Sequence, residues 1–158
     1  MIELSFYKAE DFEDLTSYVL DEIQSQFTAM PEATLDIIKE KNKGDKFPVS
    51  ILYHSIAIGF FVLDFGNDKF EMTENKQSVL LRSLSLNPDY QGKGIGKMAM
   101  VMVSGFVKEQ FPDCTEIVLA VNFNNKSAYE LYLKCGFKDE GKTRAFRNGY
   151  QHFLSKQI

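Results

Sequence analysis

The stretch of this chain that most restricts its fold is Asn87–Met100, which reads NPDYQGKGIGKMAM. It lies between a strand-like run and a helix-like run, and it contains three glycines and two lysines, namely Gly92, Gly94, Gly96, Lys93 and Lys97. A helix N-terminus carries amide groups without intrahelical partners, and glycines before it let the backbone wrap closely around a bound group. The pattern therefore predicts a strand–turn–helix unit that binds an anion. A glycine-rich turn with solvated lysines is the alternative.

Two familiar phosphate-binding loops fit this stretch poorly. The nucleoside-triphosphate loop fails because Gln91 stands where its first glycine should be and Met98 where its Ser or Thr should be. The dinucleotide fingerprint is formally met over Gly94–Ala99, but the next strand ends in Ala-Val-Asn at 120–122 where an acidic residue is required. The preceding strand, SVLLRSLSL, is also too polar for the centre of a doubly wound parallel sheet. A dinucleotide-binding fold is therefore disfavoured.

The length and composition indicate one domain over residues 1–158. The chain has 158 residues, of which 44% are hydrophobic and 25% charged, as in an ordinary globular domain. Its net charge of −4 argues against nucleic acid as a partner and is compatible with a cationic small molecule. The longest apolar run, Ile56–Leu63, is interrupted by Gly59 and is too short to span a membrane.

The termini and cysteines set an expectation about location. The N-terminal sequence MIELSFYKAED has no basic region followed by a long apolar stretch, so no secretory signal is visible. Cys114 and Cys135 are far apart and lack metal-type spacing, which favours free thiols over a disulfide. We expect a cytoplasmic protein without a metal ion.

Hydrophobic periodicity predicts a mixed α/β sheet with the element order βααβββαβαββ. Strands are predicted at residues 2–7, 49–53, 56–65, 78–86, 115–121, 137–146 and 150–155, with tight turns at His54-Ser55 and Asn148-Gly149. Helices are predicted from Asp11 past Ile23, from Pro31 to about Lys41, from the glycine stretch to about Phe111, and over 125–135. The first helix is expected to have an apolar face of Phe12, Leu15, Val19 and Ile23, and the third one of Ile95, Met98, Met102 and Phe106.

Two motifs then point to a family. Gln91–Gly96 has the form Q/R-x-x-G-x-G, and Asn125–Phe137 has the form N-x-x-A-x-x-L-Y-x-K-x-G-F. In this order and spacing they resemble the two motifs of the GCN5-related N-acetyltransferase (GNAT) superfamily. The correspondence is strong over 78–137 and consistent in element order elsewhere. It implies the GNAT fold and transfer of an acetyl group from acetyl-CoA to an amine.

The resemblance also implies where the cofactor lies. The diphosphate of coenzyme A would rest on the amides of 91–97, and the pantetheine arm would bind strand 78–86 like an extra strand, in a gap between two splayed parallel strands. The expected cofactor-binding residues are Leu84, Ser85, Leu86, Gln91, Gly92, Lys93, Gly94, Ile95, Gly96, Lys97 and Asn125. Asn125 is at the same time a candidate helix cap.

Amine attack on a thioester needs a neutral amine, a stabilised carbonyl oxygen and a sulfur that can leave. Tyr132 matches the family's tyrosine acid; the alternative is a buried aromatic on a helix face. The glutamate that serves some members as base is replaced by Ala120. Other carboxylates and two histidines have no positional support as catalysts, namely Asp64, Glu71, Glu74, His54 and His152.

The sequence says least about the amine that accepts the acetyl group. The segment 24–36, with Phe27, Met30 and Glu32, is where the resemblance places the acceptor wall. We expect direct transfer to a primary amine of a small molecule, because neither cysteine is at a position that would hold a thioester. A polyamine-like amine is favoured as the acceptor, and amino acids, aminoglycosides and peptide N-termini are alternative acceptors. A non-catalytic acyl-CoA sensor is an alternative to an enzyme. A homodimer formed through strand 56–65 or the C-terminal hairpin is a further expectation.

Overall fold

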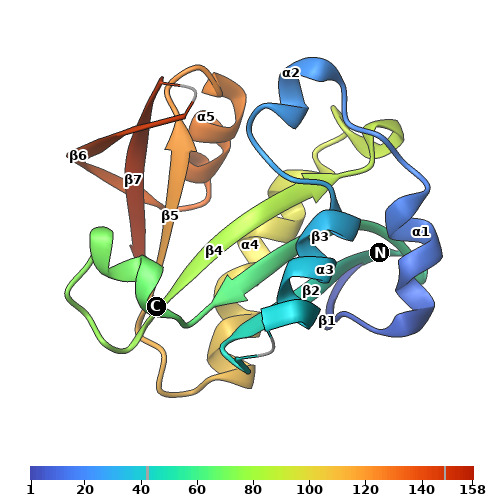
Figure 1. The fold of residues 1–158 in the computed structure, drawn as a ribbon, viewed down its shortest axis with the longest axis horizontal. Coiled ribbons are helices and arrows are strands. Elements are labelled where there is room, and N and C mark those ends of the chain that lie inside the picture. The colour runs from blue at the N-terminus through green and yellow to red at the C-terminus, as the bar shows by residue number, and fades with distance from the viewer. Residues whose placement is uncertain (42, 148) are drawn as a thin grey trace.

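The computed structural model describes residues 1–41, 43–147 and 149–158, and its described strands form one seven-stranded sheet in the order β1-β2-β3-β4-β5-β7-β6 (Figure 1). The strands are β1 (Ile2–Phe6), β2 (Lys46–Tyr53), β3 (Ile56–Asp64), β4 (Ser78–Leu86), β5 (Glu116–Asn122), β6 (Lys138–Phe146) and β7 (Gly149–Gln157). The helices are α1 (Phe12–Thr16), α2 (Glu22–Ser25), α3 (Pro31–Lys41), α4 (Ile95–Gln110) and α5 (Lys126–Lys134), with 3₁₀ turns η1 (Ala9–Asp11), η2 (Asn67–Glu71) and η3 (Pro88–Tyr90). The mixed α/β fold and the order of its main elements are confirmed.

The central feature of the sheet is the separation of β4 and β5, its one parallel pair among the described strands. The two strands pair only where Ser78–Leu80 lies beside Glu116–Val118. Both continue beyond that point, β4 to Leu86 and β5 to Asn122. They diverge toward their C-terminal ends, as Figure 1 shows. The main chain of β4 therefore loses its partner on this side over its last residues.

Helices cover both faces of the sheet, and the alternation along β3 separates the two cores. Phe61 and Leu63 belong to the larger core, together with α4 and with Tyr132 of α5. Phe60 and Val62 belong to a smaller core with Leu15 of α1. We call the two sides the α4 face and the α1 face; Figure 1 looks onto the α1 face. The sheet therefore packs against α4 and α5 on one face and against α1 on the other.

Gly59 in β3 allows the close approach of β3 and β4. A Cβ atom built on Gly59 would lie 2.9 Å from the carbonyl oxygen of Ser85 and 2.9 Å from Cδ1 of Leu86. The first contact is with backbone, which cannot move aside without shifting β4. Any side chain at position 59 would clash with β4, so glycine is required there.

We expect Gly59→Ala to destabilise the protein by about 1–3 kcal/mol, the usual cost of overpacking a tight site. Gly105→Ala is the matched control, because Gly105 lies within α4 and, apart from the helix itself, the part of the chain that the structure describes has no atom within 4 Å of the added methyl group. Alanine there should stabilise the helix by about 0.5–1 kcal/mol. Urea denaturation measures both changes, and equal stabilities for the two variants would contradict the steric explanation.

The first predicted helix is wrong beyond Thr16. α1 ends there, α2 begins at Glu22, and Val19 and Ile23 are 79% and 68% exposed. The buried residues of this segment are Leu15, Tyr18 and Leu20. Their spacing does not fit a helix face, and it lets an irregular segment fill the α1-face core.

The buried face of α4 also differs from the prediction. Met98 and Met102 are 52% and 38% exposed, and the stripe that packs on the sheet is instead Ile95, Ala99, Val103 and Val107. The helix is apolar on most sides, so periodicity alone did not select its buried face. Pro31 does begin α3, the turn at His54-Ser55 joins β2 to β3, and β6 pairs antiparallel with β7. Asn148 of the second predicted turn lies outside the described residues.

Candidate active site

The glycine stretch forms a left-handed turn that ends at the N-terminus of α4. Gly92 and Gly94 have φ angles of 74° and 79°, values that favour glycine. Gly94 is the N-cap of α4, and its carbonyl oxygen accepts a hydrogen bond from the amide of Met98 at 3.1 Å. The amides of Ile95, Gly96 and Lys97 precede that first helical donor and have no partner within the helix. The turn thus presents successive main-chain donors at the positive end of a 16-residue helix.

The surroundings of this turn suit a diphosphate. Lys93 and Lys97 are exposed, and Lys93 Nζ lies 5.9 Å from the ring centre of Tyr90. Apart from the adjoining residues of the chain, no atom of the described residues lies within 4 Å of a Cβ built on Gly92 or Gly94. Main-chain donors, cations and open space therefore coincide here, and the predicted diphosphate contacts of 91–97 fit this geometry.

The end of β4 supplies main-chain groups next to this turn. The amide of Asn87 donates to the carbonyl oxygen of Ile58 in β3 at 2.7 Å. Because antiparallel strands alternate the direction of their main-chain groups, Leu84 and Leu86 turn theirs away from β3, toward the side where β5 has separated. Ser85 turns its main chain toward β3 instead. The geometry therefore favours Leu84 and Leu86, and not Ser85, as main-chain partners of a pantetheine arm.

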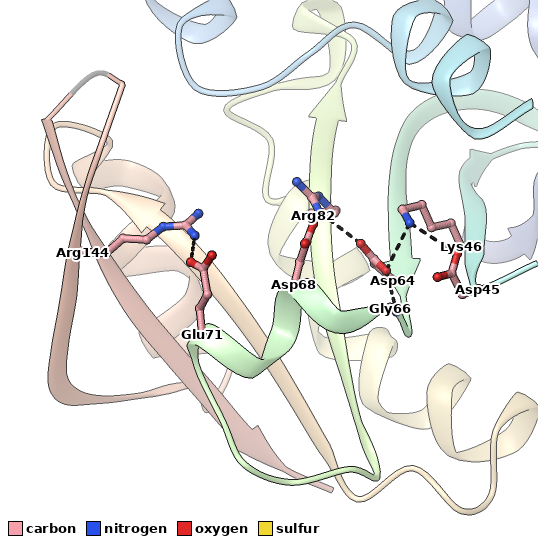
Figure 2. A network of polar contacts seen from close by, with 8 residues as sticks. All are labelled: Asp45, Lys46, Asp64, Gly66, Asp68, Glu71, Arg82 and Arg144. Carbon is pink, nitrogen blue, oxygen red and sulfur yellow. Dashed lines mark hydrogen bonds and ion pairs between the residues drawn. The ribbon is translucent and has the colours of Figure 1, made fainter. Parts of the chain in front are cut away.

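An ion-pair network fixes β4 where it leaves β5 (Figure 2). Arg82 donates to Asp64 at 3.1 Å and to Asp68 of η2 at 2.8 Å. The hydrogen bond from Arg82 lowers the pKa of Asp68 below its ordinary value. The next residue, Ser83, has a φ of 60° and lies in an irregularity of the β3–β4 ladder. The network holds β4 against β3 and η2 at the start of its unpaired stretch.

None of the carboxylates considered as a base lies at the end of β4. Asp64 is 1% exposed and bound to Arg82. Glu71 is ion-paired with Arg144 of β6 (Figure 2). Glu74 lines an open groove of about 610 Å³ together with Glu116, at the end where β4 and β5 still pair. The site therefore provides no base from this set.

The two histidines have structural surroundings. His54 lies exposed in the β2–β3 turn, as predicted. His152 is in β7, an internal strand and not an edge, where its ring stacks between Phe123 and Tyr129 at 4.0 and 4.3 Å. Its Nδ1 lies 3.3 Å from a carboxylate oxygen of Asp139.

Neither a metal-ion site nor a membrane-spanning helix is found in the described residues. Among them, no three His, Cys, Asp or Glu side chains are arranged to hold a metal ion. In the same part of the chain, none of the helices is long and apolar enough to cross a membrane.

Tyr132 lies in the α4-face core with a free hydroxyl group. It is 6% exposed and packs against Phe137, with ring centres 5.7 Å apart. Within the described chain its Oη has no hydrogen-bond partner. Burial, followed by the nearby Cys135, raises the pKa of Tyr132 far above its ordinary value, so the phenol keeps its proton at neutral pH. The thiol of Cys135 lies 3.9 Å from the carbonyl oxygen of Lys97 and so connects α5 to the glycine turn.

Asn125 is the N-cap residue of α5, but its side chain makes no capping hydrogen bond. The capping role considered for this side chain is therefore wrong. Its main-chain amide donates to Asn122 at 2.9 Å, which holds the turn between β5 and α5. The side-chain amide is not used by the helix, which leaves it for the predicted cofactor contact.

Sequence reasoning missed two residues that contact the predicted cofactor segment. Tyr18 Oη lies 2.9 Å from Ser85 Oγ, and Gln24 exchanges hydrogen bonds with Gln91 at 2.6 and 3.2 Å. Each pair is separated by 67 residues in the sequence, so no local pattern could have revealed it. In the predicted acceptor wall, Met30 packs into the α1-face core.

Comparisons with known proteins identify the family of the chain. The acetyltransferase (GNAT) family matches residues 10–137. The chain is 39% identical to the uncharacterized N-acetyltransferase YbbJ of Bacillus subtilis (strain 168), over 97% of this chain and 98% of that protein.

Solved structures of low sequence identity share the fold. One is the aminoglycoside acetyltransferase AAC(6')-Ib in complex with coenzyme A and kanamycin, with a TM-score of 0.78 and 18% identity over 99% of this chain and 95% of that chain. Another is a chimera of the spermidine N-acetyltransferase SpeG from Vibrio cholerae and hSSAT, with a TM-score of 0.69 and 18% identity over 99% and 95% of the two chains. With the family match over most of its length, the chain belongs to the acetyltransferase (GNAT) family and is an acetyl-CoA-dependent N-acetyltransferase.

Proposed function

We propose that this enzyme moves the acetyl group of acetyl-CoA directly to a primary amine of a small cationic molecule, in a ternary complex. The observation that carries the proposal is the presence together of three features: the glycine turn at the N-terminus of α4, the end of β4 that β5 leaves unpaired, and Tyr132 in the core on the α4 face. Diphosphate, pantetheine and sulfur would meet these features in that order along the cofactor.

In the proposed reaction, the lone pair of a neutral amine attacks the thioester carbonyl carbon from the α1 face. Main-chain amides of β4 would stabilise the negative charge that develops on the carbonyl oxygen. The carbon–sulfur bond then breaks, the electron pair stays on sulfur, and the amine loses a proton to solvent. The phenol of Tyr132 would donate a hydrogen bond to the leaving sulfur. Its raised pKa favours this hydrogen bond over complete proton transfer, because a thiolate with an ordinary pKa of about 8.5 is the weaker base.

Charge supports a cationic acceptor. The chain has a net charge of −4, which is compatible with a cationic acceptor. Of the structures with the same fold, one is an aminoglycoside acetyltransferase in complex with kanamycin, and another is a chimera that includes a spermidine N-acetyltransferase. Kanamycin and spermidine both carry several amines. A polyamine or an aminoglycoside is therefore the first class to test.

An acetylation assay with an amine panel tests this proposal. The panel contains spermidine, kanamycin, free amino acids and a peptide with an unblocked N-terminus, and mass spectrometry detects the acetylated product. We expect turnover with a polycationic small molecule and little with the peptide or amino acids. Preferential acetylation of the peptide would replace the proposed acceptor, and no turnover with any amine would remove the small-amine assignment.

A further inference from the structure

Residues 17–30 form a segment with little regular structure of its own. It contains only the four-residue helix α2, and its apolar side chains Val19 and Ile23 point outward, 79% and 68% exposed. In Figure 1 this segment lies on the α1 face near the end of β4. Its position must therefore depend on the contacts that it makes with the rest of the protein. Two of them reach the residues that we assign to the cofactor.

The first contact joins Tyr18 to Ser85 of β4. The two hydroxyl oxygens lie 2.9 Å apart, and the residues are 5% and 3% exposed. Ser85 stands between Leu84 and Leu86, whose main-chain groups face the separated side of β4. A buried hydrogen bond at this position ties the segment to the stretch of β4 that would receive the pantetheine arm.

The second contact joins Gln24 of α2 to Gln91 of the glycine turn. Each side-chain amide donates to the other, Gln24 Nε2 to Gln91 Oε1 at 2.6 Å and Gln91 Nε2 to Gln24 Oε1 at 3.2 Å. Gln91 Nε2 also donates to the carbonyl oxygen of Leu86 at 2.7 Å. Because that carbonyl turns toward the separated side of β4, a cofactor arm bound there would share or displace the Gln91 contact, and Gln24 would respond.

We propose that Tyr18 and Gln24 are positioning residues that link segment 17–30 to the cofactor-binding stretch 84–97, so that coenzyme A binding orders this segment, whose residues 24–30 belong to the proposed wall of the acceptor site. The inference rests on the proposed function, because it needs coenzyme A at 84–97. It goes beyond it by coupling donor and acceptor sites through two side-chain contacts.

Hydrogen exchange read by mass spectrometry tests the coupling without an acceptor, with coenzyme A as the probe. In the wild-type protein we expect saturating coenzyme A to slow exchange in peptides from 84–97 and also, by about tenfold, in peptides from 17–30. Tyr18→Phe and Gln24→Ala should each reduce the protection of 17–30 to about threefold or less while 84–97 stays protected. The two changes are independent, so a folding defect in one leaves the other informative.

Matched controls are Tyr7→Phe, a tyrosine that packs in the same α1-face core, and Gln110→Ala, an exposed glutamine at the end of α4. Both should keep the full protection of 17–30. Protection of 84–97 without protection of 17–30 in the wild type would overturn the coupling and leave the proposed function standing. An absence of coenzyme A binding by titration would overturn both.

Discussion

Tyr132→Phe is expected to lower kcat by about 10²–10³-fold, the range of a lost general acid or hydrogen-bond donor to a leaving group. The ring remains in the α4-face core, and the hydroxyl that is removed has no partner in the described chain. The affinity for coenzyme A and the free energy of unfolding should therefore change little. Turnover with the best amine of the panel and a coenzyme A titration measure the two quantities.

The pH dependence adds a second readout for Tyr132. Because its pKa is raised in the folded protein, the phenol stays protonated at and above its ordinary pKa of 10.0. Its ionisation should therefore cause no loss of rate up to that pH. The stability that depends on the neutral phenol is complete below pH 10.0 and falls as the pH rises above it, since only the unfolded chain then ionises readily.

Tyr129→Phe is the matched control, three residues earlier on the same helix. Its hydroxyl donates to Asp139 at 2.7 Å, so its removal should lower the melting temperature and leave kcat near the wild-type value. If Tyr132→Phe turns over as fast as the wild type, Tyr132 is not the donor to sulfur and its place in the core is structural.

Gly96→Glu is expected to weaken coenzyme A binding by about 10²-fold while the protein becomes more stable. Gly96 is the second residue of α4, and an added Cβ meets only Leu86 Cδ2, at an ordinary 3.9 Å. A glutamate there favours the helix through propensity and the helix dipole, by about 0.5–1 kcal/mol from each. The same carboxylate would compete for the free amides and repel a diphosphate, by about 1–4 kcal/mol at close range.

The opposite signs of these two effects make the test specific. Gly96→Gln adds similar bulk without charge and should weaken binding by about tenfold or less. Gly105→Glu adds the same charge elsewhere on α4 and should leave the affinity unchanged. Isothermal titration with coenzyme A and thermal unfolding give both quantities. Unaltered affinity in Gly96→Glu would place the diphosphate away from this turn.

The sequence predicted well those features that depend on local backbone preference. Gly92 and Gly94 adopt the positive φ angles that their residue type allows, and Pro31 begins a helix because its fixed φ suits the first turn. The two motifs indicated the family before any contact was known.

Other features needed the packed molecule. The outward positions of Val19, Ile23 and Met98 contradict the apolar periodicity, because a segment's buried side is chosen by what it packs against and not by its own pattern. Nor could the sequence indicate that the side chain of Asn125 does not cap α5, or that the main chain of Ser85 points toward β3.

By itself, then, the sequence determined the turn at Gly92–Gly96, the order of the main elements and the family. Only the tertiary structure decided that β4 and β5 separate after three paired residues, and that Tyr18 and Gln24 meet Ser85 and Gln91 across 67 positions. The physical reason is the range of the forces involved. Backbone preferences act within a few residues, whereas contacts between distant segments depend on how the whole sheet and its helices pack.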